Sequence, residues 1–187
     1  MNRSDVADMT ERTLKENEVF RGRIFTAYDD EIEVPGGGHS RREYVSHRGG
    51  VCCAALNERD ELAFVSQYRY AYRQVVTELP AGKLEPDELP EEAIRREIKE
   101  EIGAECSGWR DMGRLYPTPG YCNEVIHLYA CRIDSIGEQS PDEDECLEVE
   151  YIHIDKAVEM VMAGQLPDSK TQVLVLKIAE LLRLGEF

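Results

Sequence analysis

Hydrophobic and polar residues alternate in short runs over much of the chain, with the two-residue period that is typical of β-strands. Two runs, residues 51–56 and 62–69, are more continuously apolar, and the polar residues 57–61 between them predict a hairpin in the core of the protein. Strands are expected at residues 18–25, 31–34, 42–46, 51–56, 62–69, 109–116, 125–132 and 147–154.

Apolar residues also recur at the spacing of a helix. Ile94, Ile98 and Ile102 follow one another every four residues, after Pro90 and before Gly103. Proline is tolerated at the first position of a helix, and glycine commonly ends one. Further helices are expected at residues 155–163 and 170–184. Strands and helices together predict an α/β fold.

The start of the chain and residues 35–38 carry no strand pattern. Residues 1–16 are polar and charged, which predicts a helical or frayed leader and argues against a secretory signal. Pro35 and the three glycines after it favour a turn between two strands. A glycine run can also bind phosphate, but such a loop leads into a helix, and none is expected here.

The composition is that of a soluble protein. With 187 residues, 42% of them hydrophobic, the chain suffices for one domain, or for one domain with an N-terminal extension. No apolar run approaches the roughly 20 residues of a membrane span. The six cysteines form no C-x-x-C pair, which favours reduced thiols in the cytoplasm. Cys52 and Cys53 are adjacent in an expected strand and should point to opposite faces of it.

The formal net charge of −16 argues against binding to nucleic acids or to anionic membranes. It is compatible with a phosphate-bearing small molecule, provided that metal ions and local arginines offset the negative charge. The expected partner is therefore a small molecule, with no nucleic acid and no membrane.

The main candidate for chemistry is a cluster of carboxylates on the helix that begins at Pro90. Glu97, Glu100 and Glu101 fall on one face of this helix, where like charges repel one another. A divalent cation such as Mg²⁺, which prefers carboxylate oxygens, would relieve this repulsion and could hold a phosphate. The alternative is an ordinary acidic face that is exposed to solvent.

The residues around this cluster follow a long, gapped pattern. Gly82 is followed after five residues by Glu88, and after seven more by the run from Arg96 to Gly103. This pattern resembles the signature of the Nudix hydrolases, enzymes that cleave a nucleoside diphosphate linked to another group. Ala104 departs from it, because the family usually has a larger aliphatic residue there. The resemblance implies the family's α/β/α sandwich of mixed sheets, here with an N-terminal extension of antiparallel strands.

The resemblance also implies a division of the chain. Residues 1–48 would form a leader and a strand extension, and residues 49–187 would form the Nudix domain. The extension carries Arg41, Arg42 and Glu43, which are expected to pack against a partner subunit. The implied assembly is a homodimer.

Three flanking segments, at residues 67–70, 78–83 and 117–124, are similar to those of the ADP-ribose pyrophosphatases within this family. The implied activity is hydrolysis of ADP-ribose to AMP and ribose 5-phosphate. Enzymes that act on GDP-mannose carry similar segments, so a pyrophosphatase for another nucleoside diphosphate sugar is the first alternative. A module that senses ADP-ribose without turnover is the second, and the complete set of glutamates argues against it.

The resemblance assigns metal-binding roles to four residues. Glu97 and Glu101 would be the main ligands of Mg²⁺, with Mn²⁺ as the other possible ion. Glu100 would bridge or bind through water, and the backbone carbonyl of Ala81 would complete the shell.

It implies two further catalytic roles. Arg96 would orient the site by pairing with Glu88 or with a neighbouring carboxylate, and an ordinary surface ion pair is the alternative. A general base that deprotonates the attacking water would come from the acidic loop at residues 140–145, with Glu143 favoured and Glu145 second. A solvated acidic turn is the alternative for this loop.

The expected substrate-binding residues are Arg42, Arg69, Glu78 and Gly120. Arg69 is the foremost, because a guanidinium offers planar, bidentate donors that can grip a phosphate or stack on a base. An exposed strand arginine is the alternative. Gly120 would bring a backbone amide near the substrate, although the proline before it also favours a simple turn.

Overall fold

The computed structural model describes residues 8–140 and 146–187. The chain divides into two compact units. The first takes in the residues up to Arg48 together with Thr118–Glu124, and the second takes in Gly49–Pro117 and Val125–Phe187. That the first unit forms a dimer interface stays a prediction.

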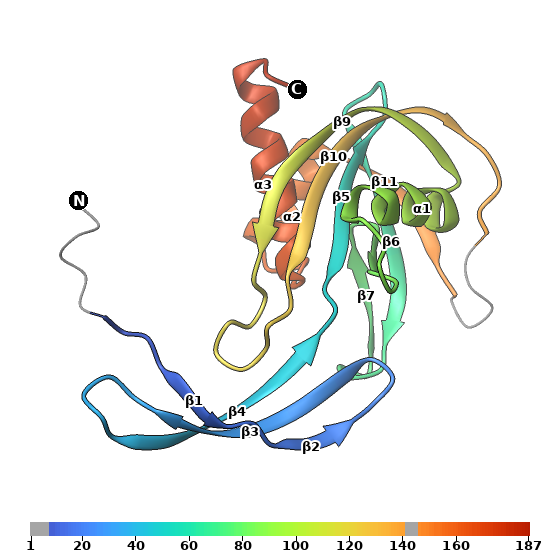
Figure 1. The fold of residues 1–187 in the computed structure, drawn as a ribbon. Coiled ribbons are helices and arrows are strands. Elements are labelled where there is room, and N and C mark those ends of the chain that lie inside the picture. Colours follow the sequence, from blue (N-terminus) through green and yellow to red (C-terminus); the bar gives the residue numbers. More distant parts are fainter. Residues whose placement is uncertain (1–7, 141–145) are drawn as a thin grey trace. The chain divides into compact units, whose positions relative to one another are not determined.

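The first unit contains one antiparallel sheet of four strands (Figure 1). They are β1 (Arg12–Lys15), β2 (Glu18–Arg21), β3 (Phe25–Glu33) and β4 (His39–His47). β3 pairs with β4 along one edge and with β1 and β2 along the other. The turn expected after Pro35 joins β3 to β4, with Gly36 and Gly37 at φ of 94° and 86°, in the left-handed region that favours glycine.

The strand β1 corrects the expectation for the start of the chain. The sequence predicts a helical or frayed leader over residues 1–16, which is wrong for residues 12–15, because these pair with residues 31–33 of β3. All four residues of β1 are exposed, so no apolar alternation marks them as a strand. Hydrogen bonding to β3, and not a local sequence pattern, therefore makes residues 12–15 a strand.

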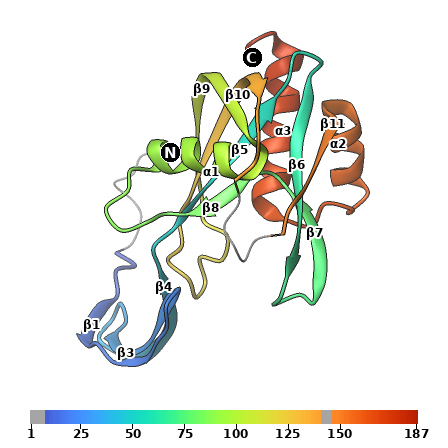
Figure 2. The same ribbon diagram turned by 90° about the vertical axis from the view of Figure 1, so that its right-hand side faces the viewer.

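The second unit contains a mixed sheet of seven strands (Figure 2). They are β5 (Gly50–Leu56), β6 (Glu61–Arg69), β7 (Gln74–Glu78), β8 (Ala81–Lys83), β9 (Ala104–Leu115), β10 (Ile126–Ile136) and β11 (Glu148–His153). Their order is β11-β6-β5-β10-β9, with β7 paired to β6 and β8 paired to β5. β5 and β10 run parallel, and the other pairs are antiparallel. The predicted hairpin of β5 and β6 is confirmed, with Leu56 opposite Leu62.

Helices cover both faces of this sheet (Figures 1 and 2). They are α1 (Pro90–Ile102), α2 (Ile154–Met162) and α3 (Ser169–Leu184). Cys52 of β5 packs in the core beneath α2 and α3, whereas Cys53 packs in the core beneath α1, so the adjacent cysteines point to opposite faces as expected. The layers confirm the predicted α/β/α sandwich.

The helix α1 begins and ends where the sequence predicts. Pro90 lies in its first turn, and Gly103 ends it in the left-handed conformation, with φ of 64°. Ile94, Ile98 and Ile102 are buried against the sheet. This packing fixes the rotation of the helix about its axis, and therefore the direction in which its glutamates point.

The short strands β7 and β8 are not predicted by the sequence. β7 follows the turn at residues 70–73, and β8 has only three residues, too few to carry an alternating pattern. Both are held by pairing with longer neighbours, β6 and β5. β8 matters most for the candidate site, because it lies next to α1.

All six cysteines are free thiols, as expected. Within residues 8–140 and 146–187, no helix combines the length and the apolar character needed to cross a membrane.

Candidate active site

The carboxylates of α1 are turned inward to different degrees. The exposed fraction is 8% for Glu97 and 2% for Glu101. The Glu100 side chain is more open, with 32% exposed. Burying a carboxylate is costly unless hydrogen bonds or opposite charges compensate it. A solvated acidic face therefore does not describe Glu97 and Glu101.

The strand β8 lies directly against these two glutamates. The Ala81 N–H donates to Oε2 of Glu101 at 2.9 Å. An ideal Cβ built on Gly82 would stand 1.8 Å from Oε1 of Glu97, closer than real Cβ atoms approach any atom. The Glu97 carboxylate thus occupies the space that any other residue at position 82 would need.

Arg96 links the carboxylates to one another. Its Nε and Nη2 donate to the two oxygens of Glu88 at 2.9 and 3.1 Å, which is the pairing expected. Its Nη1 donates to Oε1 of Glu97 and to Oε2 of Glu100, both at 2.9 Å. The hydrogen bonds with Glu88, followed by the charge of Glu97, raise the pKa of Arg96 above its usual value. The guanidinium therefore stays charged, orients these side chains and offsets part of their charge.

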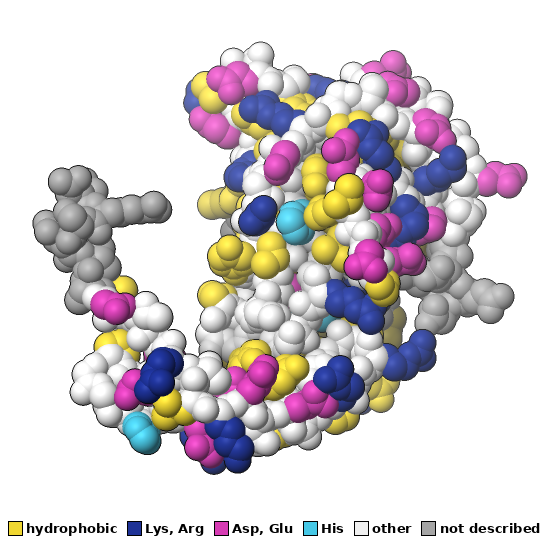
Figure 3. Space-filling view, viewed as in Figure 1, with side chains coloured by type: hydrophobic (Ala, Val, Ile, Leu, Met, Phe, Trp, Pro, Cys, Tyr) yellow, Lys and Arg dark blue, Asp and Glu magenta, His cyan; other side chains and the backbone are white. Residues whose placement is uncertain are grey.

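This set of oxygens fits a hard divalent cation. Mg²⁺ takes carboxylate oxygens and keeps several waters, and Glu97, Glu100 and Glu101 offer such oxygens beside a glycine. Among the described residues, no three acidic, histidine or cysteine side chains are already arranged as a metal centre. Acidic and basic side chains lie side by side over the face that carries α1 (Figure 3). A cation would have to take oxygens that Arg96 now holds.

The segment that leads to the expected general base is tied to the end of α1. The Nε2 of Gln139 donates to the carbonyl oxygen of Glu101 at 2.5 Å. The Ser140 N–H donates to the carbonyl oxygen of Glu100 at 3.0 Å. Glu143 and Glu145 themselves lie outside the described residues, so their role stays a prediction.

Arg69, the expected phosphate ligand, lies at the end of β6 and contacts Glu78 of β7. Its Nε donates to Oε1 of Glu78 at 2.5 Å. Glu78 is only 2% exposed, and its other oxygen accepts from Nζ of Lys170. Burial alone would lower the pKa of Arg69, but the hydrogen bond to Glu78 and the charges of nearby carboxylates, Glu101 among them, raise it. Glu78 is thus placed to hold Arg69.

Asp168 and Lys170, at the start of α3, are missed by the sequence analysis. Asp168 caps the helix, since its Oδ2 accepts from the Thr171 N–H at 2.9 Å. Its Oδ1 lies 3.0 Å from Nζ of Lys170. An aspartate three residues before a threonine at a helix start is a signal for the cap. No local pattern shows that the lysine between them turns inward.

Two expected substrate-binding residues belong to the first unit and are described within it alone. Arg42, on β4, donates from Nε to Oε2 of Glu11 at 2.9 Å. Gly120 lies in a turn in which the Cys122 N–H donates to the carbonyl oxygen of Thr118 at 3.0 Å. Apart from Gly120 and its two chain neighbours, no atom of the described residues lies within 4 Å of the position of a Cβ at Gly120. Substrate binding by Arg42 and Gly120 stays a prediction.

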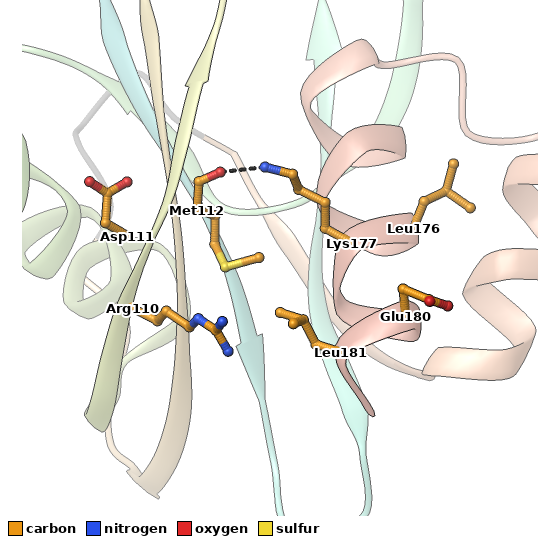
Figure 4. Close-up of a pocket in the computed structure, with 7 residues that line it drawn as sticks. All are labelled: Arg110, Asp111, Met112, Leu176, Lys177, Glu180 and Leu181. Atoms are coloured by element: carbon orange, nitrogen blue, oxygen red, sulfur yellow. Dashed lines mark hydrogen bonds between the residues drawn. The ribbon is translucent and has the colours of Figure 1, made fainter. Parts of the chain in front are cut away.

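A hollow of about 500 Å³ lies between β9 and α3, in the layer opposite α1 (Figure 4). Met112, Leu176 and Leu181 are its apolar lining residues, and Lys177 donates to the carbonyl oxygen of Met112. Its acidic residues, Asp111 and Glu180, point away from one another (Figure 4). This hollow therefore lacks converging carboxylates, and the candidate active site is the contact between α1 and β8.

Comparison with known proteins agrees with the motif on α1. A family model described as NUDIX domain matches residues 46–173. The methanol dehydrogenase activator of Bacillus methanolicus is 35% identical over 167 residues, which cover 88% of this chain and 90% of the relative. The ADP-ribose pyrophosphatase of Bacillus subtilis (strain 168) is 32% identical over 165 residues, covering 87% and 89%. The GDP-mannose pyrophosphatase of Cronobacter sakazakii (strain ATCC BAA-894) is 30% identical over 146 residues, covering 73% and 76%. On the family model and these identities, the chain belongs to the NUDIX family.

Proposed function

We propose that this protein hydrolyses the diphosphate bond of a nucleoside diphosphate sugar, with ADP-ribose as the preferred substrate and AMP and ribose 5-phosphate as the products. The observation that carries the proposal is the pair Glu97 and Glu101, buried on α1 and fixed against β8. Buried carboxylates held in one orientation suit metal-assisted hydrolysis of a phosphoanhydride. They do not serve solubility, which needs exposed charges.

The charge of the site explains why the reaction would need a cation. The chain carries a net charge of −16, and a diphosphate adds further negative charge. A bound cation supplies electrophilic activation of the phosphoryl group and of the attacking water. We propose Mg²⁺, with Mn²⁺ as a substitute, held by Glu97, Glu100 and Glu101 and by the backbone carbonyl of Ala81.

The side chains of the protein then have separate tasks. Arg96 keeps Glu97 and Glu100 in place through two hydrogen bonds of 2.9 Å. Arg69 would donate from its terminal nitrogens to an oxygen of the diphosphate, because its Nε is already bonded to Glu78. Glu143 would accept the proton of the attacking water as general base.

The relatives support the substrate class more firmly than the particular sugar. The match to the ADP-ribose pyrophosphatase of Bacillus subtilis covers 87% of this chain, against 73% for the GDP-mannose pyrophosphatase. The longer match favours ADP-ribose over GDP-mannose. A pyrophosphatase for GDP-mannose or another nucleotide sugar is the alternative. No feature of the described residues favours the role named for the Bacillus methanolicus relative.

We also propose a cytoplasmic homodimer in which the first unit packs against the partner subunit. Val19, Phe20, Ile24 and Phe25 of this unit are exposed, and the rings of Phe20 and Phe25 lie 5.6 Å apart. Clustered exposed apolar side chains are typical of protein interfaces. Sedimentation equilibrium checks this: a monomer at micromolar concentration would contradict the dimer.

The proposed function is tested by a phosphate-release screen. The protein and Mg²⁺ are incubated with ADP-ribose, GDP-mannose and other nucleoside diphosphate sugars, and phosphatase is added to release phosphate from the products. We expect kcat/KM for ADP-ribose to exceed that for GDP-mannose by about tenfold or more. Equal or reversed preference would move the assignment to the general class of nucleoside diphosphate sugar pyrophosphatases. Binding of ADP-ribose without phosphate release from any compound would support the sensing module instead.

A further inference from the structure

Lys170 is a buried lysine to which the proposed chemistry gives no task. It is 8% exposed and lies in the first turn of α3, in the layer opposite α1. Burying an ammonium group is costly, and well-packed apolar residues can often replace a buried ion pair without loss of stability. A contribution to stability therefore does not by itself explain why a lysine is buried at position 170. Its hydrogen-bond partners indicate another role.

A continuous line of charged contacts runs from α3 to Arg69. Asp168 lies 3.0 Å from Nζ of Lys170, and Lys170 donates to Oε2 of Glu78. The Oε1 of Glu78 accepts from Nε of Arg69 at 2.5 Å. Two carboxylates and two cations alternate along this line, so their charges balance. The side chain of Glu78 is 3% exposed and that of Arg69 is 39% exposed, so the line opens to solvent at Arg69.

The direction of Arg69 depends on Glu78. Within the described part of the chain, Glu78 is the carboxylate that pairs with Arg69, and it does so through Nε. A guanidinium held at Nε keeps its two terminal nitrogens together on the other side, as a planar fork that suits phosphate oxygens. Glu78 can hold this direction only if its own carboxylate does not rotate. Lys170 prevents that rotation by binding the second oxygen.

Thr171 ties the next residue of the same segment to α3. Its Oγ1 accepts from the Leu79 N–H at 2.9 Å. Glu78 and Leu79 are thus both bonded to the first turn of α3, by a side chain and by the backbone. The segment continues into β8, which contacts Glu101. The start of α3 therefore supports both the arginine and the strand of the candidate active site.

We propose that Lys170 is a positioning residue, which acts through Glu78 to direct the Arg69 guanidinium toward the diphosphate of the substrate. This inference rests on the proposed function and goes beyond it, because it makes α3, in the layer opposite the catalytic helix, a determinant of substrate affinity. Lys170 itself contacts neither the substrate nor the cation.

A positioning role has a kinetic signature that a structural role lacks. If Arg69 grips the diphosphate equally in the ground state and in the transition state, its displacement raises KM and leaves kcat nearly unchanged. A structural role would instead lower the amount of folded enzyme, which reduces the apparent kcat and leaves KM as it is.

The test compares the full-length protein with Lys170→Met, using ADP-ribose and Mg²⁺. Lys177→Met is the matched control, since Lys177 lies on the same helix, lines the hollow between β9 and α3, and donates to the carbonyl oxygen of Met112. We expect Lys170→Met to raise KM by about tenfold, with kcat within about threefold of the wild type. Adding Lys170→Met to Arg69→Ala should raise KM no further, because both substitutions remove the same interaction. Lys177→Met should leave both constants unchanged.

A folded Lys170→Met protein with the KM of the wild type would contradict the inference, and so would effects of Lys170→Met and Arg69→Ala that simply add. If Lys170→Met does not fold, because Glu78 is left charged and buried, the variant Glu78→Gln/Lys170→Met removes both charges and must show the same rise in KM. Absence of turnover in the wild type contradicts the proposed function, and the inference with it. Turnover with an unaltered KM in these variants contradicts the inference alone.

Discussion

The carboxylate of Glu97 fills the position that a side chain on Gly82 would occupy, since an ideal Cβ there would stand 1.8 Å from Oε1 of Glu97. Gly82 is not among the glycines with positive φ, so its backbone conformation does not demand glycine. Glycine is required here because α1 approaches β8 closely and leaves no space for a side chain. Gly82 and Glu97 of the motif therefore depend on each other, because the glycine leaves the space that the glutamate carboxylate fills.

This contact predicts the behaviour of Gly82→Ala. The variant should fold, because the displaced atoms belong to the end of a flexible side chain. It should lose about 10² or more in kcat/KM, because the Glu97 carboxylate must leave its place. Kinetics on ADP-ribose, with circular dichroism for the fold, check this. Gly137→Ala is the control, since its Cβ would make an ordinary contact of 3.5 Å with the Gly103 carbonyl oxygen. Full activity in Gly82→Ala would mean that the position of Glu97 is unimportant.

Removal of metal gives a second prediction. Activity should vanish in excess EDTA and return with millimolar Mg²⁺ or Mn²⁺, because Glu97, Glu100 and Glu101 cannot hold an anionic diphosphate without a cation. Turnover of ADP-ribose before and after chelation is the measurement. Undiminished turnover in EDTA would exclude the proposed cation.

The pair of Arg96 and Glu88 predicts a dependence of stability on pH. The hydrogen bonds from Arg96 lower the pKa of Glu88 below the usual value of 4.5 for a glutamate. A depressed pKa in the folded state means that the pair contributes its full stability above pH 4.5, and that this contribution is lost as the pH falls through the folded value. Urea unfolding should therefore show Glu88→Gln to be less stable than the wild type near neutral pH. The difference should shrink in acid, and a difference that is constant with pH would contradict the assignment.

The parts of the fold that the sequence predicts are those with a strong local pattern. The helix α1 is marked by Pro90, by Gly103 and by three isoleucines at helical spacing, and it forms where expected. The strands β5 and β6 are apolar runs buried in the core. In each case, the apolar residues that predict the element are also the ones that pack in the core, so the sequence pattern and the packing agree.

The parts that the sequence does not predict depend on distant partners. All four residues of β1 are exposed, and its pairing with β3 makes it a strand. Lysine is rarely buried, so Lys170 reads as a surface residue. Its inward direction depends on Glu78, which is 92 residues away in the chain. The candidate site follows the same rule: the helix motif is local, whereas the support of Arg69 by α3 arises only in the folded protein.

The general base is the subject of a further prediction. Glu143→Gln should lower kcat by about 10² to 10⁴, with little change in the affinity for substrate or metal, as expected for loss of general base catalysis. The attachment of Gln139 and Ser140 to the end of α1 motivates this, because it starts the acidic segment beside Glu100 and Glu101. Glu145→Gln is the control, and it should lower kcat much less than Glu143→Gln does. If neither substitution lowers kcat by about tenfold, Glu100 becomes the leading candidate for the base.

The central claim, that the buried carboxylates of α1 carry out hydrolysis, is tested most directly at Glu101. Glutamine has nearly the same shape and can still accept the hydrogen bond from the Ala81 N–H, so Glu101→Gln removes the charge and keeps the packing. The measurement is the formation of AMP and ribose 5-phosphate from ADP-ribose with Mg²⁺, by the wild type and by Glu101→Gln, with circular dichroism of both. We predict that the wild type forms both products and that the variant is slower by about 10³ or more with an unchanged spectrum. Equal rates of hydrolysis by the two proteins would contradict the account.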